Sequence, residues 1–215
     1  MRRWPTSGDT TGMLAPLPPG FAETRVQLHR VAEEVLKPAR ERVTGRFGLR
    51  ALPGGFGTPP FGDVMQLHVD GVDLVIRGGN DVRREPIDGV DPAAAAALAA
   101  WFAFGAGVLE ELRADADAAL APTPPQLWPE HFDVAIELGD EAGGKRATYG
   151  ASPGDDEHAE PYLYVATWAA PPEGPLWNAT AFPGAELSYG ELLAAEDRRA
   201  AAHDFYRERV AALVG

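Results

Sequence analysis

The chain of 215 residues contains no cysteine. Disulfide bonds, thiolate-ligated zinc, iron–sulfur clusters and cysteine nucleophiles are therefore excluded. Stability must come from packing, and a chain of this length can bury enough apolar surface to fold without cross-links. The hydrophobic share of 45% and the charged share of 24% are those of a globular protein rather than of a disordered chain.

Long hydrophobic runs are also missing. No window approaches the roughly 18 uninterrupted apolar residues of a membrane-spanning helix. The longest apolar region, 92–109, consists mostly of alanine. The basic start at Arg2 and Arg3 is followed by polar residues and proline, not by the apolar core of a secretory leader. We therefore expect a cytoplasmic protein with no membrane partner.

Basic residues are scarce relative to acidic ones. The chain has 19 Lys and Arg against 32 Asp and Glu, which gives a formal net charge of −13. The phosphate backbone of a nucleic acid repels a chain of this charge, so we expect no nucleic-acid partner.

Familiar catalytic motifs are absent. The sequence holds no GxGxxG after a strand, no GxxxxGK[ST], no HExxH, no GxSxG and no EF-hand loop. Nucleotide hydrolysis by a P-loop, zincin chemistry and α/β-hydrolase chemistry are therefore poor hypotheses. Whether the chain is an enzyme stays open at this point.

The residues that are present predict an arm followed by one domain. Residues 1–20, rich in proline and glycine, predict a flexible or extended N-terminal arm, and residues 21–215 predict a single domain. Thr24 and Gln27 have the spacing of a capping box and predict the start of a helix. Pro38 should break or kink that helix.

Short strands and one long helix complete the first half. Asp91 is a good N-cap for the helix, which should end before Pro122. Gly105 and Gly107 within it indicate either close approach to another element or a kink. The strand pattern predicts a strand at 46–52, a loop at 53–60, a hairpin of 63–69 and 73–77 that turns at Asp70-Gly71, and a strand at 82–87.

The second half repeats this order loosely. Ser188 and Glu191 form another capping-box pair that opens a short helix. The alternation of apolar and polar residues predicts strands at 132–138, 146–150, 162–168 and 176–182, and a last helix at 196–213.

This order of elements predicts an α+β fold. Hairpin connections imply a mainly antiparallel sheet with helices packed on one face. The pattern also suggests a loose tandem repeat of helix, three or four strands and helix, with halves at 21–121 and 126–215. The short proline-rich link at 121–129 favours one continuous sheet over two.

Two stretches resemble a known protein family. The run LWPEHFD at 127–133 resembles a tryptophan-proline-histidine-phenylalanine-aspartate motif of an uncharacterised bacterial family that is common in actinobacteria. Residues 152–154 and 160–164 are similar to that family's proline-glycine turn and the aromatic strand after it. The resemblance implies the same order of elements, and it implies no activity.

A cluster of histidines and carboxylates is the first candidate site. His131 and Asp133 share one face of the predicted strand, and His158 and Glu160 recur with the same spacing in the loop 150–161. If loop and strand meet, these four residues could bind a divalent metal such as zinc, manganese or iron, or supply a histidine base oriented by a carboxylate. The alternative is a strand start and a solvated acidic turn.

Aromatic side chains form the second candidate site. Tyr162, Tyr164 and Trp168 fall on one face of a predicted strand, and Trp177 follows nearby in the sequence. An aromatic-lined concavity with a few polar groups is typical of a small-molecule pocket. The alternative is that these rings pack under the helices as core.

These observations favour binding over catalysis. The first hypothesis is a module that binds a small molecule through the aromatic residues, or a domain that contacts a protein partner through the arm or an exposed sheet. The alternative is a metal-dependent, hydrolase-like enzyme that uses the histidine and carboxylate cluster. The sequence makes no prediction of the oligomeric state.

Overall fold

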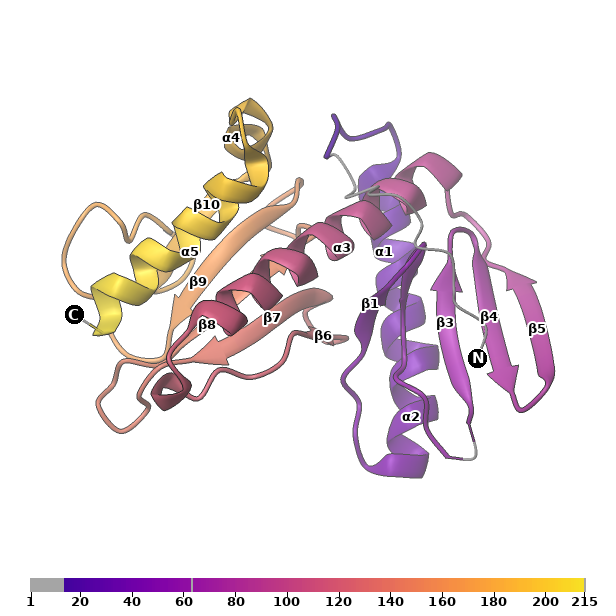
Figure 1. The fold of residues 1–215 in the computed structure, drawn as a ribbon. Helices are drawn as coiled ribbons and strands as arrows, with labels where there is room; N and C mark the ends of the chain where they lie inside the picture. The colour runs from indigo at the N-terminus through magenta and orange to yellow at the C-terminus, as the bar shows by residue number, and fades with distance from the viewer. Residues whose placement is uncertain (1–13, 63, 215) are drawn as a thin grey trace, which may run out of the picture.

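Two five-stranded antiparallel sheets form the frame of the protein, in residues 14–62 and 64–214, which the computed structural model describes. The fold class is α+β, as the sequence predicts (Figure 1). The first sheet has the order β1 (Arg50–Leu52), β2 (Gly55–Gly57), β3 (Gln66–Asp70), β4 (Asp73–Gly78) and β5 (Asp81–Pro86). The second has the order β10 (Gly184–Ser188), β9 (Tyr162–Thr167), β8 (Ala147–Ser152), β7 (Asp133–Leu138) and β6 (Gln126–Trp128).

The two sheets meet at a single antiparallel bridge between Leu49 and Leu127. The N–H of each leucine donates to the carbonyl oxygen of the other, over 2.7 and 3.0 Å. The continuous sheet that the short link favours is therefore replaced by two sheets that are joined at their edge strands. Each half of the chain builds its own sheet, in which every strand lies beside its neighbours in the sequence, as short connections favour.

The first helix begins earlier than predicted and continues past its proline. Helix α1 (Phe21–Val31) follows Gly20, and a π-helical turn η1 (Ala32–Leu36) leads into α2 (Lys37–Thr44). The chain stays helical through Pro38, so the predicted break does not occur, but a π-helical turn interrupts the α-helix and ends two residues before the proline. Thr24 is not an N-cap, because its hydroxyl accepts a hydrogen bond from the N–H of Asp91 instead.

The part of the predicted arm that the structure describes lies against the C-terminal helices. Leu14 is buried, and its carbonyl oxygen accepts from Arg198. The hydroxyl of Tyr189 donates to the carbonyl oxygen of Ala15 over 2.7 Å. Residues 1–13, where most of the arm was expected, lie outside the described residues.

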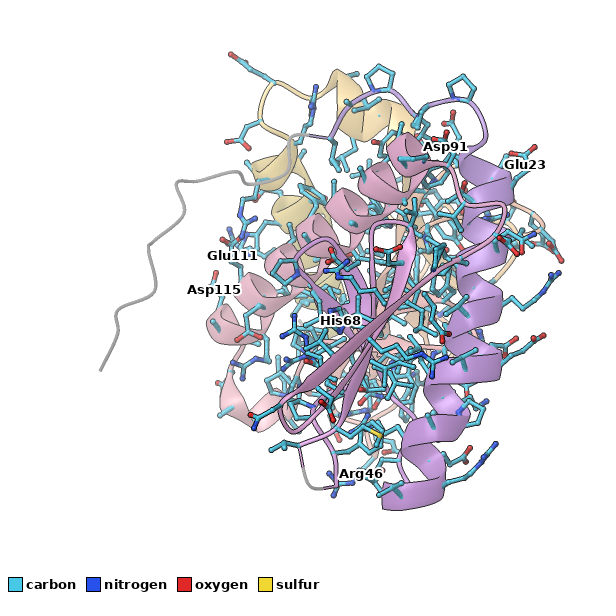
Figure 2. The ribbon with its side chains drawn as sticks, turned by 90° about the vertical axis from the view of Figure 1, so that its right-hand side faces the viewer. Glu23, Arg46, His68, Asp91, Glu111 and Asp115 are labelled. Atoms are coloured by element: carbon cyan, nitrogen blue, oxygen red, sulfur yellow. The ribbon has the colours of Figure 1, made fainter. Side chains whose placement is uncertain are left out.

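Helix α3 (Pro92–Asp115) is the central element of the fold and contacts both sheets. The side chain of Asp91 accepts from the N–H of Ala94 over 2.9 Å, which confirms the predicted N-cap. Figure 2 shows the helix running past the first sheet, from Asp91 near Glu23 of α1 to Asp115 at the far end. By length and composition it could span a membrane, but just over half of its most apolar window is buried here against the rest of the chain.

Close packing explains one glycine of α3. A Cβ on Gly105 would lie 2.5 Å from the Cβ of Ala151 on β8. The close approach that Gly105 predicts is therefore confirmed, and it brings the helix backbone down onto the second sheet.

Two strand predictions need correction. Residues 55–57, predicted as loop, form β2, because Gly55 and Gly57 present no side chain to the backbone of β3 beside them. Residues 176–182 do not form a strand. Asn178 instead makes the edge contacts of β10 with its side-chain amide, since it donates to and accepts from the backbone of Glu186 over 3.1 and 3.0 Å.

Helices cover one face of the second sheet and leave the other open. Helix α5 (Arg198–Val214) lies beside α3 across this sheet, and the capping box of Ser188 and Glu191 opens the short helix α4 (Tyr189–Ala194), as predicted (Figure 1). Leu163 and Val165 of β9 point under the helices and are fully buried. Their neighbours Tyr162 and Tyr164 therefore point to the open face, where the candidate site lies.

Candidate functional site

A pocket of roughly 900 Å³ lies on the open face of the second sheet. Its volume is in the range of small-molecule sites. Strands β7, β8 and β9 form the floor, and α1, the turn before β7 and the loop after β8 form the walls. The lining residues are Arg25, Val26, His29, Trp128, Glu130, His131, Phe132, Asp133, Ala135, Glu137, Thr148, Ser152, Gly154, Asp155, Asp156, Glu157, Tyr162, Tyr164, Ala166 and Phe182.

The turn before β7 is held against α1 and α2. The N–H of Phe132 donates to the carbonyl oxygen of Trp128 over 2.7 Å, and Nε2 of His29 lies 2.8 Å from the carbonyl oxygen of Pro129. Lys37 forms an ion pair with Glu130 over 2.6 Å. These contacts fix the point at which the chain enters β7.

Phe132 has an unusual backbone conformation for a bulky residue. Its φ angle is +56°, in the left-handed region. The ring is fully buried, stacks on His29 with the ring centres 4.9 Å apart, and meets Phe56 and Phe102 edge to face. The packing of the ring in the core compensates for the strain of this backbone conformation. The conformation changes the direction of the chain just before Asp133, which lines the pocket.

Asp133 is the buried carboxyl of the pocket, with only 4% of its surface exposed. The hydroxyl of Tyr164 donates a hydrogen bond to Oδ2 of Asp133. Oδ1 has no hydrogen-bond partner among the described residues. Buried polar atoms in folded proteins almost always have a partner, so this oxygen needs an explanation.

Gly150 is the reason that Tyr164 can reach Asp133. Tyr164 lies on β9 and Asp133 on β7, and β8 separates these two strands. Gly150 of β8 pairs with Tyr164. A Cβ on Gly150 would overlap the Tyr164 ring. Because the glycine leaves this space empty, the ring lies across β8 and its hydroxyl meets the carboxyl on the next strand.

Burial changes the acidity of both groups. Loss of hydration raises the pKa of Asp133 to about 6, although the hydrogen bond from Tyr164 and the charge of His131 act in the opposite direction. Burial and the charge of Asp133 raise the pKa of Tyr164 well above its ordinary value. The tyrosine therefore keeps its proton as a donor, while the aspartate changes charge near neutral pH.

Asp155 is a second carboxyl with the opposite behaviour. Its Oδ2 accepts from the Tyr162 hydroxyl over 2.7 Å, and its Oδ1 accepts from the N–H groups of Glu157 and His158 over 2.8 Å each. Partial burial opposes ionisation of Asp155, but these hydrogen bonds outweigh it and lower the pKa of the carboxyl. Asp155 is therefore a satisfied carboxylate, in contrast to Asp133.

Arg25 of α1 adds a buried positive charge to the pocket. Its side chain is 8% exposed, Nη1 has no hydrogen-bond partner, and among the described residues it makes no ion pair. The guanidinium lies against the loop after β8. A Cβ on Gly154 in that loop would be only 2.8 Å from Nη1 of Arg25.

The four predicted metal ligands do not come together as a metal site. His131 and Asp133 line the pocket, but His158 contacts Asp155 and Glu186 over 3.2 Å each, and Glu160 is exposed outside the pocket lining. Within residues 14–62 and 64–214, no three histidine, aspartate or glutamate side chains are arranged to hold a metal ion. The physical reason is that the two ring nitrogens of His158 already contact Asp155 of its own loop and Glu186 of β10.

The four predicted aromatic ligands divide into two pairs. Tyr162 and Tyr164 line the pocket, as the strand alternation predicts. Trp168 is 48% exposed and outside the lining, where its indole donates to Thr148 over 3.1 Å and covers the Arg146 guanidinium. Trp177 packs against the core and also lies outside the pocket lining.

Sequence reasoning missed several pocket residues. Asp155 belongs to the acidic loop in which His158 was singled out, and its spacing of three from that histidine is the signal of a local turn. Nothing in the sequence around Arg25 or Gly150 indicates that either residue belongs to a pocket. An arginine on a helix face is ordinarily solvated, and a glycine in a strand does not reveal which side chain will cover it.

Comparisons with protein-family models, with curated proteins and with solved structures find no match for this chain. The resemblance to the actinobacterial family therefore stays a prediction, and the site is interpreted from its own geometry.

Proposed function

We propose that the protein binds a small organic molecule in the pocket on the open face of the second sheet. The observation that carries the proposal is Asp133, a buried carboxyl in the pocket wall with an oxygen that no described residue satisfies. A bound molecule would supply the missing partner, since leaving a buried polar atom unpaired costs roughly 1–3 kcal/mol.

The chemistry of the walls supports this proposal. Small-molecule sites combine apolar and aromatic surface with a few convergent polar groups. Here the aromatic surface comes from Trp128, Tyr162 and Phe182, and the polar groups are Asp133 and Arg25. Tyr164 and Asp155 are tied to internal partners, so they shape the pocket and hold its floor in place.

A screen of small fragments by saturation-transfer NMR tests the proposal. The screen uses cationic, anionic, zwitterionic and neutral aromatic fragments with the full chain, and repeats it with Ala166→Trp. Ala166 is one of the residues that line the pocket floor, so an indole at this position projects into the pocket and occupies part of it. Val82→Trp is the matched control, because Val82 is an exposed residue of β5 on the other sheet.

We expect fragments that bind the wild-type chain and Val82→Trp but lose binding to Ala166→Trp. Fragments that bind all three proteins equally would place any binding elsewhere, and a screen without hits would contradict the proposal. Circular dichroism of each variant establishes that the fold is retained.

A further inference from the structure

Two buried groups of opposite charge line the pocket without contacting each other. Asp133 and Arg25 are both more than nine-tenths buried, and each has a polar atom without a partner among the described residues. We infer that the ligand of this pocket is zwitterionic, with a protonated amine for Asp133 and a carboxylate for Arg25, as in an α-amino acid with an apolar side chain. This inference rests on the proposed function and specifies the class of ligand.

The strand register places the two groups in the same part of the pocket. Val134, the residue after Asp133, pairs with Ala151, the residue before Ser152, so Asp133 lies at the end of β7 that adjoins the end of β8. Gly154, against which the Arg25 guanidinium packs, comes two residues after Ser152. Both groups therefore lie toward the end of β8, and no ion pair joins them among the described residues.

The other carboxyls of the pocket do not compete for the amine in the same way. Glu130 is paired with Lys37, and Glu137 is paired with Arg146 over 3.2 Å. Asp155 already accepts three hydrogen bonds from its own loop and from Tyr162. Asp156 and Glu157 are exposed at the rim. Asp133 is thus the buried carboxyl with an unused acceptor.

Charge explains why one ligand should satisfy both groups. A buried ion without a partner is costly, and a partner of opposite charge placed beside it recovers much of that cost. An amine alone would leave Arg25 unpaired, and a carboxylate alone would leave Asp133 unpaired. A molecule that carries both charges a few bonds apart pairs both groups, and guanidinium is the preferred donor for a carboxylate.

The aromatic walls indicate the remainder of the ligand. Trp128 and Phe182 line the pocket beside Tyr162, which is fixed in place by its hydrogen bond to Asp155 and by stacking on His158, with ring centres 4.2 Å apart. Such surfaces favour an apolar or aromatic side chain, and their faces also attract a nearby ammonium group.

Four related probes test the inference by isothermal titration calorimetry. Phenylalanine carries both charges, 2-phenylethylamine only the amine, 3-phenylpropionate only the carboxylate, and 2-phenylethanol neither. With the wild-type chain we expect phenylalanine to bind at least about tenfold more tightly than each of the other three.

Two variants assign the charges to the residues. Asp133→Asn should weaken binding of phenylalanine and of 2-phenylethylamine but not of 3-phenylpropionate. Arg25→Gln should weaken binding of phenylalanine and of 3-phenylpropionate but not of 2-phenylethylamine. Arg25→Lys keeps the charge and should recover part of the affinity, and the wild-type series decides the question even if a variant fails to fold.

The outcomes separate this inference from the proposed function. If 2-phenylethanol binds as tightly as phenylalanine and loses binding to Ala166→Trp, the pocket is a binding site and the zwitterionic ligand is wrong. Equal affinity for phenylalanine and one singly charged probe would also overturn the inference. If none of the four probes binds, the amino-acid class is wrong, and the fragment screen decides the pocket separately.

Discussion

At the scale of single residues, the absence of a side chain at Gly150 decides how the pocket floor is built. Tyr164 lies over this glycine and reaches Asp133 two strands away. The tyrosine hydroxyl is satisfied by this contact, whereas the aspartate is satisfied only on one oxygen. One oxygen of Asp133 therefore has a structural role, and the other has no hydrogen-bond partner among the described residues.

Gly150→Ala should destabilise the fold by about 1–3 kcal/mol, because the added methyl group overlaps the Tyr164 ring in a closely packed region. Urea denaturation measures the free energy of unfolding. Gly190→Ala is the matched control, since no atom lies within 4 Å of the added Cβ in α4. In a Tyr164→Ala background the cost of Gly150→Ala should largely disappear, and an unchanged cost would contradict the overlap.

Asp133 should make stability depend on pH in an unusual direction. Its pKa of about 6 exceeds the ordinary value of 3.8 for an aspartate, so between these values the folded state binds more protons than the unfolded state. The free energy of unfolding contributed by Asp133 therefore falls as pH rises through this window, by about 3 kcal/mol in total. Besides burial, the side chains that act on this carboxyl are Tyr164, His131 and Glu130.

Asp133→Asn removes this loss of stability. The wild-type chain loses this contribution as the pH rises from about 4 to 7, and the variant does not. The free energy of unfolding of the variant minus that of the wild type should therefore increase by about 3 kcal/mol over this pH range. Urea denaturation at several pH values gives the difference, and Asp156→Asn controls for the removal of one exposed carboxyl. A difference that stays constant with pH would show that the folded environment does not hold a proton on Asp133.

At the scale of elements, the junction of α1 and α2 with the turn before β7 positions the site. His29 contacts Pro129 and stacks on Phe132, while Lys37 pairs with Glu130. The π-helical turn η1 connects α1 to α2 without a break in the helical chain. The contacts of His29 and of Lys37 with the turn before β7 therefore come from one continuous helical segment. The pocket wall that carries Arg25 is thereby tied to the turn that leads into Asp133, the first residue of β7.

The start of α3 is a second element-scale feature, and its N-cap can be removed without touching the pocket. Asp91→Ala should cost about 1 kcal/mol, because the N–H of Ala94 loses its acceptor. Asp88→Ala, an exposed carboxyl in the preceding loop, is the control and should leave the denaturation midpoint unchanged. Equal effects of the two substitutions would point to charge rather than to capping.

At the scale of the whole molecule, α3 packs against both sheets, whose edge strands meet at the bridge between Leu49 and Leu127. Phe102 of α3 is fully buried and meets Phe56 of the first sheet and Phe132 of the second half edge to face, with ring centres 5.8 and 5.2 Å apart. Because one side chain contacts both halves, the halves should unfold together.

Phe102→Ala should lower the free energy of unfolding by about 3–5 kcal/mol through the cavity that it leaves. Hydrogen exchange followed by mass spectrometry should show faster exchange in both sheets of the variant. Phe182→Ala, the same substitution at a half-buried loop residue, is the control and should cost less. Faster exchange in one sheet alone would contradict the shared core.

The sequence by itself determined the α+β class, the hairpin at Asp70-Gly71, the caps at Asp91 and Ser188 and the faces of β9, because each depends on local spacing or on neighbours in the chain. Only the tertiary structure decided the division into two sheets, the continuity of the first helix past Pro38 and the loss of the predicted metal cluster.

The site shows the same division most clearly. Tyr162 and Tyr164 could be assigned to one face from alternation alone, and both line the pocket. That Asp133 and Arg25 would be buried with unpaired atoms could not be predicted. The burial of these side chains and their hydrogen-bond partners depend on which distant elements pack together. The residues next to Asp133 and Arg25 in the sequence do not indicate which elements those are.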